Sequence, residues 1–308
     1  MGPRETTSQV RQEPRRFYDG GVLPYDDEPG LPPDPDQDPR IVLERHTDDG
    51  VERFSLERRV GYLDRHLGEI LVPAERGFRT DLTSTPALFT WLVPKTGAHL
   101  PAALIHDGLV PGGADGATSY VSSEGHVIDR VSADRVFRDA MADTGTGVVR
   151  RWIVWAAVTV ATIFVGAGTP WTPLQRWRYR SAAGATIAAI LYLGYAATAD
   201  LFDRSVPLAG PVPWMGDRPW WLEVLGGFAG AIVVPLALSL GWGRFRVAGA
   251  IAGVMLAVLL HVTVGLAAIT LAYQGLERLA RRSPAAARAV GAVIGVAAIA
   301  VFGWLTLG

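Results

Sequence analysis

The residues of this chain that are best suited to chemistry are a histidine, a serine and several aspartates between residues 81 and 134. Imidazole and carboxylate groups can transfer protons near neutral pH, and they can hold a divalent cation with an open position for water. The sequence therefore predicts a hydrolase-type site in which the histidine is a general base or a metal ligand. The candidate catalytic residues are His106, Asp107, Asp134, Asp81 and Ser84, and the candidate ligands of a divalent metal are His106, Asp107 and Asp134.

The same residues also have a structural interpretation. Asp81 and Ser84 can close a turn and cap a helix through their side-chain oxygens. Asp134, in the first turn of a predicted helix, favours the helix dipole, and it can pair with Arg130 or Arg138 four residues away. Adjacent side chains on a helix point about 100° apart, which makes it difficult for a histidine-aspartate pair to reach one ion. A catalytic or metal site and a polar scaffold are both compatible with the sequence.

Three short helices are expected to position these groups. Thr85 would cap a helix that begins at Pro86 and stops at Pro94. A second helix begins near Pro101 and runs into the histidine-aspartate pair, and a third begins at Ser132. Apolar residues at helical spacing in the third helix predict one buried stripe, which consists of Ala133, Phe137, Ala140 and Met141.

The segment between the second and third helices, residues 110–129, has to fold back for that stripe to reach the core. This return would bring the end of one helix next to the start of the other. We therefore expect His106, Asp107 and Asp134 to lie within one side-chain length of each other, with Asp81 close by.

Residues 41–80 show the alternation of apolar and polar side chains that is typical of strands. The dipeptide Asp49-Gly50 tolerates the positive φ that a tight hairpin turn needs. An antiparallel meander of about three strands is therefore predicted, and the expected fold class of residues 41–168 is α+β. The apolar runs that carry this prediction are 41–43, 51–62 and 69–72.

Together these segments resemble a bacterial and phage family, Domain of Unknown Function 1353, over about residues 41–166. The resemblance rests on the order of a valine-proline strand, a glycine-phenylalanine-x-threonine-aspartate turn, a serine-x-proline, a histidine-aspartate pair and an arginine-x-x-alanine-aspartate. The family has no assigned activity, so the resemblance implies a fold and the location of a site but no reaction. The matching positions are Val72, Pro73, Gly77, Phe78, Thr80, Asp81, Ser84, Pro86, His106, Asp107, Arg130, Ala133 and Asp134.

The first 40 residues differ in composition from those that follow. They contain 8 of the 21 prolines, with nine acidic residues and five arginines, and such a segment cannot bury enough apolar surface to offset its ordering entropy. We predict a disordered tail over residues 1–40. In the whole chain, a net charge of -1 gives no reason to expect nucleic acid as a partner, and the absence of cysteine excludes thiolate metal sites.

Residues 169–308 are expected to be an all-α membrane region. Four charge-poor segments are each long enough to cross the hydrocarbon core of a bilayer, and tryptophans lie near their ends. The predicted transmembrane helices are 181–199, 224–242, 247–273 and 289–307.

Two features of these segments suggest contacts within the membrane. His261 falls near the middle of 247–273, where an ionisable side chain is a functional hypothesis by default, with an interhelical hydrogen bond as the structural alternative. Glycines four residues apart allow helices to approach closely, including those of a second copy or of another membrane protein. The pairs are Gly226/Gly230, Gly249/Gly253 and Gly291/Gly295.

Residues 151–168 have two interpretations. They are apolar enough to enter a bilayer, and they also fall where the resembled family places its last domain helix. We favour a core helix, with a further span as the alternative. Because no basic segment followed by an apolar run opens the chain, we expect residues 41–168 to stay on the cytoplasmic side of a bacterial cytoplasmic membrane.

These observations predict a multispan membrane protein whose α+β domain carries a hydrolase-type histidine and aspartate site. The alternative is a non-enzymatic membrane or envelope component whose domain binds a protein partner. An enzyme needs the polar side chains at an accessible position, whereas a scaffold can bury them in hydrogen bonds with one another.

Overall fold

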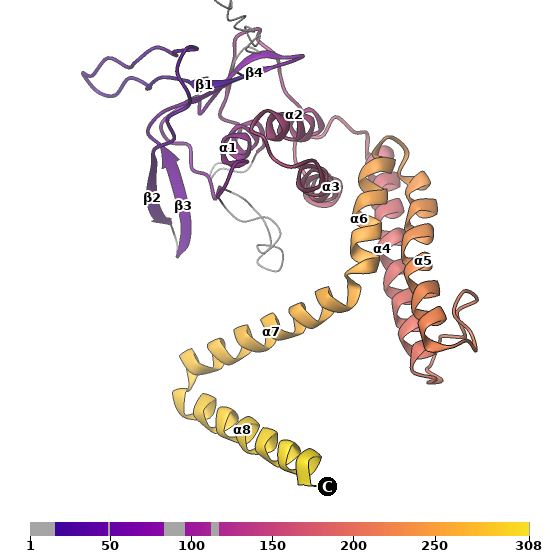
Figure 1. The fold of residues 1–308 in the computed structure, drawn as a ribbon. Helices are drawn as coiled ribbons and strands as arrows, with labels where there is room; N and C mark the ends of the chain where they lie inside the picture. The colour runs from indigo at the N-terminus through magenta and orange to yellow at the C-terminus, as the bar shows by residue number, and fades with distance from the viewer. Residues whose placement is uncertain (1–15, 49, 83–95, 112–116, 308) are drawn as a thin grey trace, which may run out of the picture. The chain divides into compact units, whose positions relative to one another are not determined.

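The computed structural model describes residues 16–48, 50–82, 96–111 and 117–307. The chain forms two compact units, Met1–Ala257 and Val258–Gly308. The larger unit begins with antiparallel strands and continues with helices, whereas the smaller unit is helical (Figure 1). This architecture confirms the predicted fold class, an α+β region followed by an all-α region.

A four-stranded antiparallel sheet forms the base of the α+β region. Its hydrogen-bonded order is β1-β4-β5-β6, and β4 is central to the register because Tyr62 pairs with Phe17 on one side and Ile70 on the other. The strands are β1 (Phe17–Asp19), β4 (Val60–Asp64), β5 (Gly68–Val72) and β6 (Val121–Ser122).

In sequence, two further strands fall between β1 and β4: β2 (Leu43–Asp48) and β3 (Val51–Leu56). They form a hairpin, and among the named strands each pairs only with the other. Gly50, with φ of +78°, supplies the left-handed conformation of its turn, as the sequence predicted. Phe54 of β3 exchanges two backbone hydrogen bonds with Thr80, each 2.8 Å. The hairpin thereby fixes the segment that carries Thr80.

The predicted disordered tail is wrong for residues 16–40. Strand β1 lies within this segment and pairs with β4, and residues 19–34 double back through bridges at Val22↔Leu31 and Tyr25↔Glu28. Asp19 is buried, and the guanidinium of Arg58 binds its carboxylate, so this buried charge is compensated by an ion pair. The ion pair and the sheet edge supply stabilisation that composition alone did not indicate. Residues 1–15 lie outside the described residues.

Two helices pack against the sheet, and a third packs against the second of them (Figure 1). The buried stripe predicted for the third predicted helix is confirmed, since Ala133, Phe137, Ala140 and Met141 are all at most 3% exposed. They pack with apolar side chains of β4, β5 and α1 in one core. The helices are α1 (Leu100–Leu109), α2 (Arg130–Asp143) and α3 (Val148–Val165).

Helix α2 begins two residues earlier than predicted. Asp129 is its N-cap, and the carboxylate accepts hydrogen bonds from the backbone N–H groups of Val131 at 2.8 Å and Ser132 at 3.0 Å. Asp134 therefore lies in the second turn, where the helix dipole has less influence. The helix expected at Pro86, with Thr85 as its cap, lies outside the described residues.

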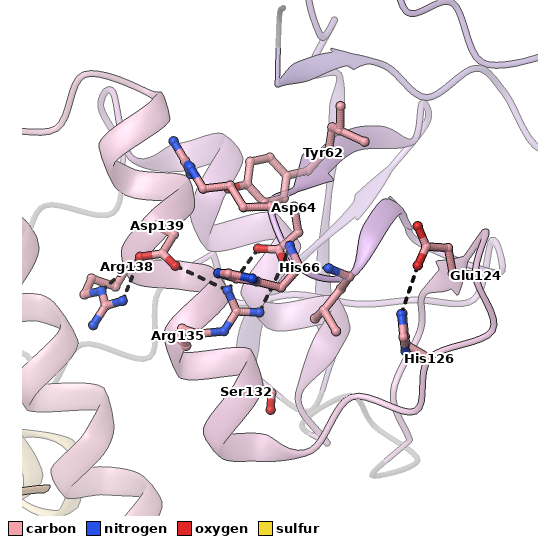
Figure 2. Close-up of polar contacts among 12 residues, drawn as sticks. Tyr62, Asp64, His66, Glu124, His126, Ser132, Arg135, Arg138 and Asp139 are labelled. Carbon is pink, nitrogen blue, oxygen red and sulfur yellow. Dashed lines mark hydrogen bonds and ion pairs between the residues drawn. The ribbon is translucent and has the colours of Figure 1, made fainter. Parts of the chain in front are cut away.

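A charged network joins α2 to the turn between β4 and β5. Figure 2 shows Arg135 between Asp64 and Asp139, with Arg138 on the other side of Asp139. The Asp64 side chain has no exposed surface and also accepts the backbone N–H of His66 at 2.9 Å. Burial would raise the pKa of Asp64, but its hydrogen bonds to Arg135 and the backbone hold that pKa below its usual value. The network fixes the rotation of α2 about its axis.

The remaining helices of the larger unit are α4 (Pro173–Leu201), α5 (Trp220–Ser239) and α6 (Arg246–Val258), with the short 3-10 helix η2 (Leu240–Phe245) before α6. They lie side by side (Figure 1). The Trp242 indole donates to Thr186 on α4 at 2.9 Å. A turn at Gly243, with φ of +60°, reverses the chain between α5 and α6.

Two of the predicted glycine pairs are used inside the chain. A Cβ at Gly226 would lie 2.0 Å from the Trp214 carbonyl oxygen, and one at Gly230 would lie 2.4 Å from the Trp214 ring. The first pair therefore holds the α4–α5 connection, because a larger side chain would displace Trp214. At Gly253 a Cβ would lie 2.9 Å from Pro235 Cβ, so that glycine allows α6 to approach α5.

The smaller unit consists of α7 (Leu260–Arg282) and α8 (Pro284–Leu307). The single helix predicted over 247–273 is wrong, because the chain divides at Leu259, which lies between α6 and α7. His261 is therefore an exposed residue in the first turn of α7, not a mid-helix group. An uninterrupted apolar run did not reveal this break. Gly291 and Gly295 on α8 have no described atom within 4 Å of an added Cβ.

Four helical segments of the described chain are long and apolar enough to cross a membrane, by length and composition. They are Val148–Val165, Pro173–Leu201, Trp220–Val258 and Pro284–Gly303. The candidates differ from the predicted spans in two ways: Val148–Val165 is an additional segment, and Trp220–Val258 contains both α5 and α6, between which the chain turns at Gly243.

Candidate functional site

The centre of the predicted site is a buried pair formed by His106 on α1 and Asp134 on α2. His106 Nε2 lies 2.9 Å from Asp134 Oδ1, and the side chains are 8% and 4% exposed. The imidazole also stacks on Phe137, which lies one turn after Asp134 on α2, with ring centroids 4.7 Å apart. The expected contact between these two polar residues is therefore present, and Phe137 holds the imidazole ring in place.

The second oxygen of Asp134 is bound by α3. Thr162 donates its hydroxyl to Asp134 Oδ2 at 2.7 Å, and Arg130 Nε lies 3.3 Å from the same hydroxyl oxygen. The predicted pairing of Asp134 with Arg130 or Arg138 is wrong. Arg130 reaches Thr162, and Arg138 binds Asp139 and lies over the rings of two tryptophans, Trp152 and Trp155.

This arrangement fixes the chemistry of the His106 ring. An ionised carboxylate can only accept hydrogen bonds, so Nε2 must be a donor toward Asp134. In a neutral imidazole the proton then sits on Nε2 and the basic lone pair on Nδ1. A carboxylate that orients the opposite ring nitrogen is the usual second partner of a catalytic or metal-binding histidine.

Asp107, next on α1, points to a different partner. Its Oδ2 accepts the hydroxyl of Thr80, whose Oγ1 in turn accepts the backbone N–H of Leu82 at 2.8 Å. Burial, together with the nearby charge of Asp81, raises the pKa of Asp107 to about 6 against the opposing effects of Thr80, His106 and Arg130. Asp107 is less buried than His106, so its carboxyl group is more accessible than the imidazole.

The predicted convergence is thus present for His106 and Asp134, and Asp107 lies within electrostatic range of both the imidazole and Asp81. Ser84 lies outside the described residues. Within the described ranges no group of three or more histidine, aspartate or glutamate side chains is placed to hold a metal ion. His106 binds Asp134 and Asp107 binds Thr80, on different sides of α1. The two side chains therefore do not point toward one common metal position.

Three residues of this cluster were absent from the predicted site. Thr80 and Arg130 match positions of the resembled family, so the motif contained a signal for both. For Thr162 the sequence contained no such signal, because the hydroxyl of a threonine in an apolar helix usually bonds to a backbone carbonyl of its own helix. Its role depends on α3 packing against α2.

Comparison with family models now identifies this region. Residues 54–158 match the family described as Protein of unknown function (DUF1353). The match spans β3 to the middle of α3 and includes every described residue of the cluster except Thr162. Comparison with curated proteins and with solved structures gives no match. The predicted resemblance is confirmed for the DUF1353 region.

The match also bears on α3, which is both apolar enough to cross a membrane and part of the DUF1353 region. Val154 belongs to the domain core, and Thr162 faces Asp134. These contacts agree with the favoured interpretation, in which the helix completes the domain.

Proposed function

We propose that the DUF1353 region is an acid-base site of hydrolytic type, attached to a bacterial cytoplasmic membrane by the helices that follow it. Asp107 is the group that exchanges a proton with the substrate or with an attacking water. His106 and Asp134 orient the site from behind, and Thr80 sets the direction of the Asp107 carboxyl.

The observation that carries this proposal is the raised pKa of a partly exposed Asp107, at about 6, beside a rigid His106–Asp134 pair. A general acid or base works best when its pKa lies near the working pH. Asp81 is a second, partly buried carboxyl whose charge acts on Asp107, and two neighbouring carboxyl groups can divide the roles of acid and base.

The orientation that we propose places the DUF1353 region in the cytoplasm. The α4–α6 group has Arg176, Arg178, Arg180, Arg244 and Arg246 at the end that joins α3, and its acidic residues lie at the other end. Short loops with excess arginine stay on the cytoplasmic side. A protease or a membrane-impermeant reagent that reaches the domain from the periplasmic side of intact cells would contradict this orientation.

The activity is tested with full-length protein in detergent against chromogenic ester, phosphomonoester and phosphodiester probes based on p-nitrophenol. The expected result is turnover of at least one probe class, with a rate that changes through an apparent pKa near 6 and falls at least about 100-fold in Asp107→Asn. The matched control is Asp139→Asn, a partly exposed carboxylate on α2 outside the cluster.

A polar scaffold predicts a different outcome. Neither the wild-type protein nor any variant would turn over the probes at any pH. That result would remove the support for an acid-base site. Binding of a protein partner by the domain, the second hypothesis from the sequence, has no specific contact in its favour.

A further inference from the structure

The charges of α4, η2 and α6 are divided between the two ends of the helix group. In residues 166–258 every acidic side chain, at positions 200, 203, 217 and 223, lies near the α4–α5 connection. Five of the seven arginines lie at the opposite end, where α4 begins and α5 passes into α6. This end, which we call the arginine end, has no carboxylate of its own segment to neutralise it.

Two arginines of this end have structural partners. Arg180 donates to the carbonyl oxygens of Ile163 at 3.1 Å and Phe164 at 2.6 Å, and so caps the last turn of α3. Arg176 contacts Thr169. These contacts hold the start of α4 against the end of α3, so the arginine end adjoins the DUF1353 region.

Three other arginines are exposed, Arg178, Arg244 and Arg246. The Arg178 guanidinium lies next to Gly243, the residue before Arg244. None of the ion pairs formed among the described residues includes these three arginines. Placing like charges together without a counter-charge is unfavourable unless an anion from outside the chain joins them.

Aromatic rings support this basic surface. Phe245 contacts both Trp171 and Tyr179, with ring centroids 5.5 Å and 5.0 Å apart, and the Arg244 guanidinium lies 5.0 Å above the Phe245 ring. Trp177, which precedes Arg178 in the chain, is 70% exposed. Tryptophan and tyrosine at the ends of long apolar helices are typical of the boundary between hydrocarbon and headgroups.

We propose that the arginine end binds the phosphate of an anionic phospholipid headgroup, in the membrane leaflet next to the DUF1353 region. Guanidinium groups recognise phosphate through paired hydrogen bonds, and they lose less hydration than ammonium groups when they do so. Arg178, Arg244 and Arg246 contact the headgroup, and Trp177 lies at the level of the glycerol backbone. The lipid neutralises the cluster and anchors the helix group close to the domain. This inference does not depend on the acid-base site.

The experiment uses the full-length protein in an uncharged detergent, titrated with phosphatidylglycerol or with phosphatidylcholine while the thermal unfolding midpoint is recorded. Phosphatidylglycerol should raise the midpoint, and phosphatidylcholine should have little effect. In the triple variant Arg178→Gln/Arg244→Gln/Arg246→Gln the apparent affinity for phosphatidylglycerol should fall at least about tenfold. The variant Arg204→Gln/Arg218→Gln, at the acidic end, is the matched control and should bind as the wild type does.

Two further measurements distinguish a lipid site from a free-anion site and from a folding defect. Inorganic phosphate at the same concentration should neither raise the midpoint nor compete with the lipid; if it competes fully, the site binds a free anion and the lipid proposal is wrong. If the triple variant does not fold, Arg244→Gln alone should weaken binding about three- to tenfold. Equal binding of phosphatidylglycerol by the wild type and by a folded arginine variant would overturn the proposal.

Discussion

The DUF1353 region and the α4–α6 group solve the problem of burial in opposite ways. In the DUF1353 region large apolar side chains such as Tyr62, Leu104 and Met141 are fully enclosed. In the α4–α6 group the large side chains of Ile190, Trp242 and Phe245 are enclosed, but many of the other contacts are made by small residues such as Ala183 and Gly253, and many large apolar side chains point outward. The outward set includes Leu191, Phe228, Val233 and Leu236.

This difference is the one expected between a domain that folds in water and helices that pack in lipid. A domain that encloses its large side chains gains stability from excluding water. A helix group that exposes them and places small residues at its contacts relies on close packing, as helices do in lipid. The charged side chains differ as well, because the DUF1353 region buries Asp64 and Asp134 with hydrogen-bond partners, whereas the charged residues of the helix group lie toward its ends. Four predictions would sharpen or break this comparison, and they run from the largest expected effect to the smallest.

The largest effect concerns the apolar outer surface of the helix group. We expect the full-length protein to remain in the membrane fraction through washes with high salt and with alkaline carbonate, and to be released only by detergent. Centrifugation followed by immunoblotting measures this partition. Recovery of the intact chain in the detergent-free supernatant would break the comparison, because the helices would then need an enclosing core of their own.

The next effect concerns the buried pair in the DUF1353 region. Asp134→Ala leaves two buried donors, His106 and Thr162, without their acceptor, and each loss costs about 1–3 kcal/mol. We expect the free energy of unfolding of the domain to fall by about 2–4 kcal/mol, measured by hydrogen exchange of α1 and α2 amides in the full-length protein. Asp139→Ala on the same helix, which breaks only partly exposed ion pairs, should cost less than about 1 kcal/mol. Equal effects of both substitutions would contradict the structure.

A smaller effect tests the glycine contacts of the helix group. In Gly226→Ala the new methyl group would meet the Trp214 carbonyl oxygen at 2.0 Å, and we expect a loss of about 1–3 kcal/mol with a change in tryptophan fluorescence. The neighbouring Gly227→Ala is the control, since its methyl group would lie 3.7 Å from Met215. The gain in helix propensity is the same in both, so the difference between their unfolding midpoints reports the contact with Trp214.

The smallest effect has the opposite sign and concerns Asp107. Its pKa of about 6 in the folded protein lies above the ordinary 3.8, so the folded state holds the proton more tightly. This contribution favours folding at low pH and is lost as the pH rises from about 4 to about 6. Asp107→Asn should therefore stabilise the domain by about 1–2 kcal/mol at pH 7.5 and leave it unchanged near pH 4. A constant difference across this pH range would show that the pKa is not raised.

Much of the DUF1353 region follows from local patterns. The buried stripe on α2 was readable because Ala133, Phe137, Ala140 and Met141 repeat at helical spacing, and the β2–β3 turn was readable at Gly50. The contact of His106 with Asp134 could be inferred because residues 110–129 have to fold back for the stripe on α2 to reach the core, which brings the end of α1 next to the start of α2. The bond between Thr162 and Asp134 could not be inferred, since nothing in the sequence distinguishes Thr162 from other threonines. Thr80 matches a position of the resembled family, but that match did not indicate that it binds Asp107.

The sequence by itself determined the division of the chain into a DUF1353 region and apolar helices, because hydrophobic periodicity and length are local properties. It also determined that five of the seven arginines of residues 166–258 lie in segments apart from the acidic residues. Only the tertiary structure decided that residues 16–40 join the sheet, that the chain divides at Leu259, and that Thr162 completes the Asp134 pair. Each of these depends on contacts between residues distant in the chain or on a local backbone break, and composition carries no record of either.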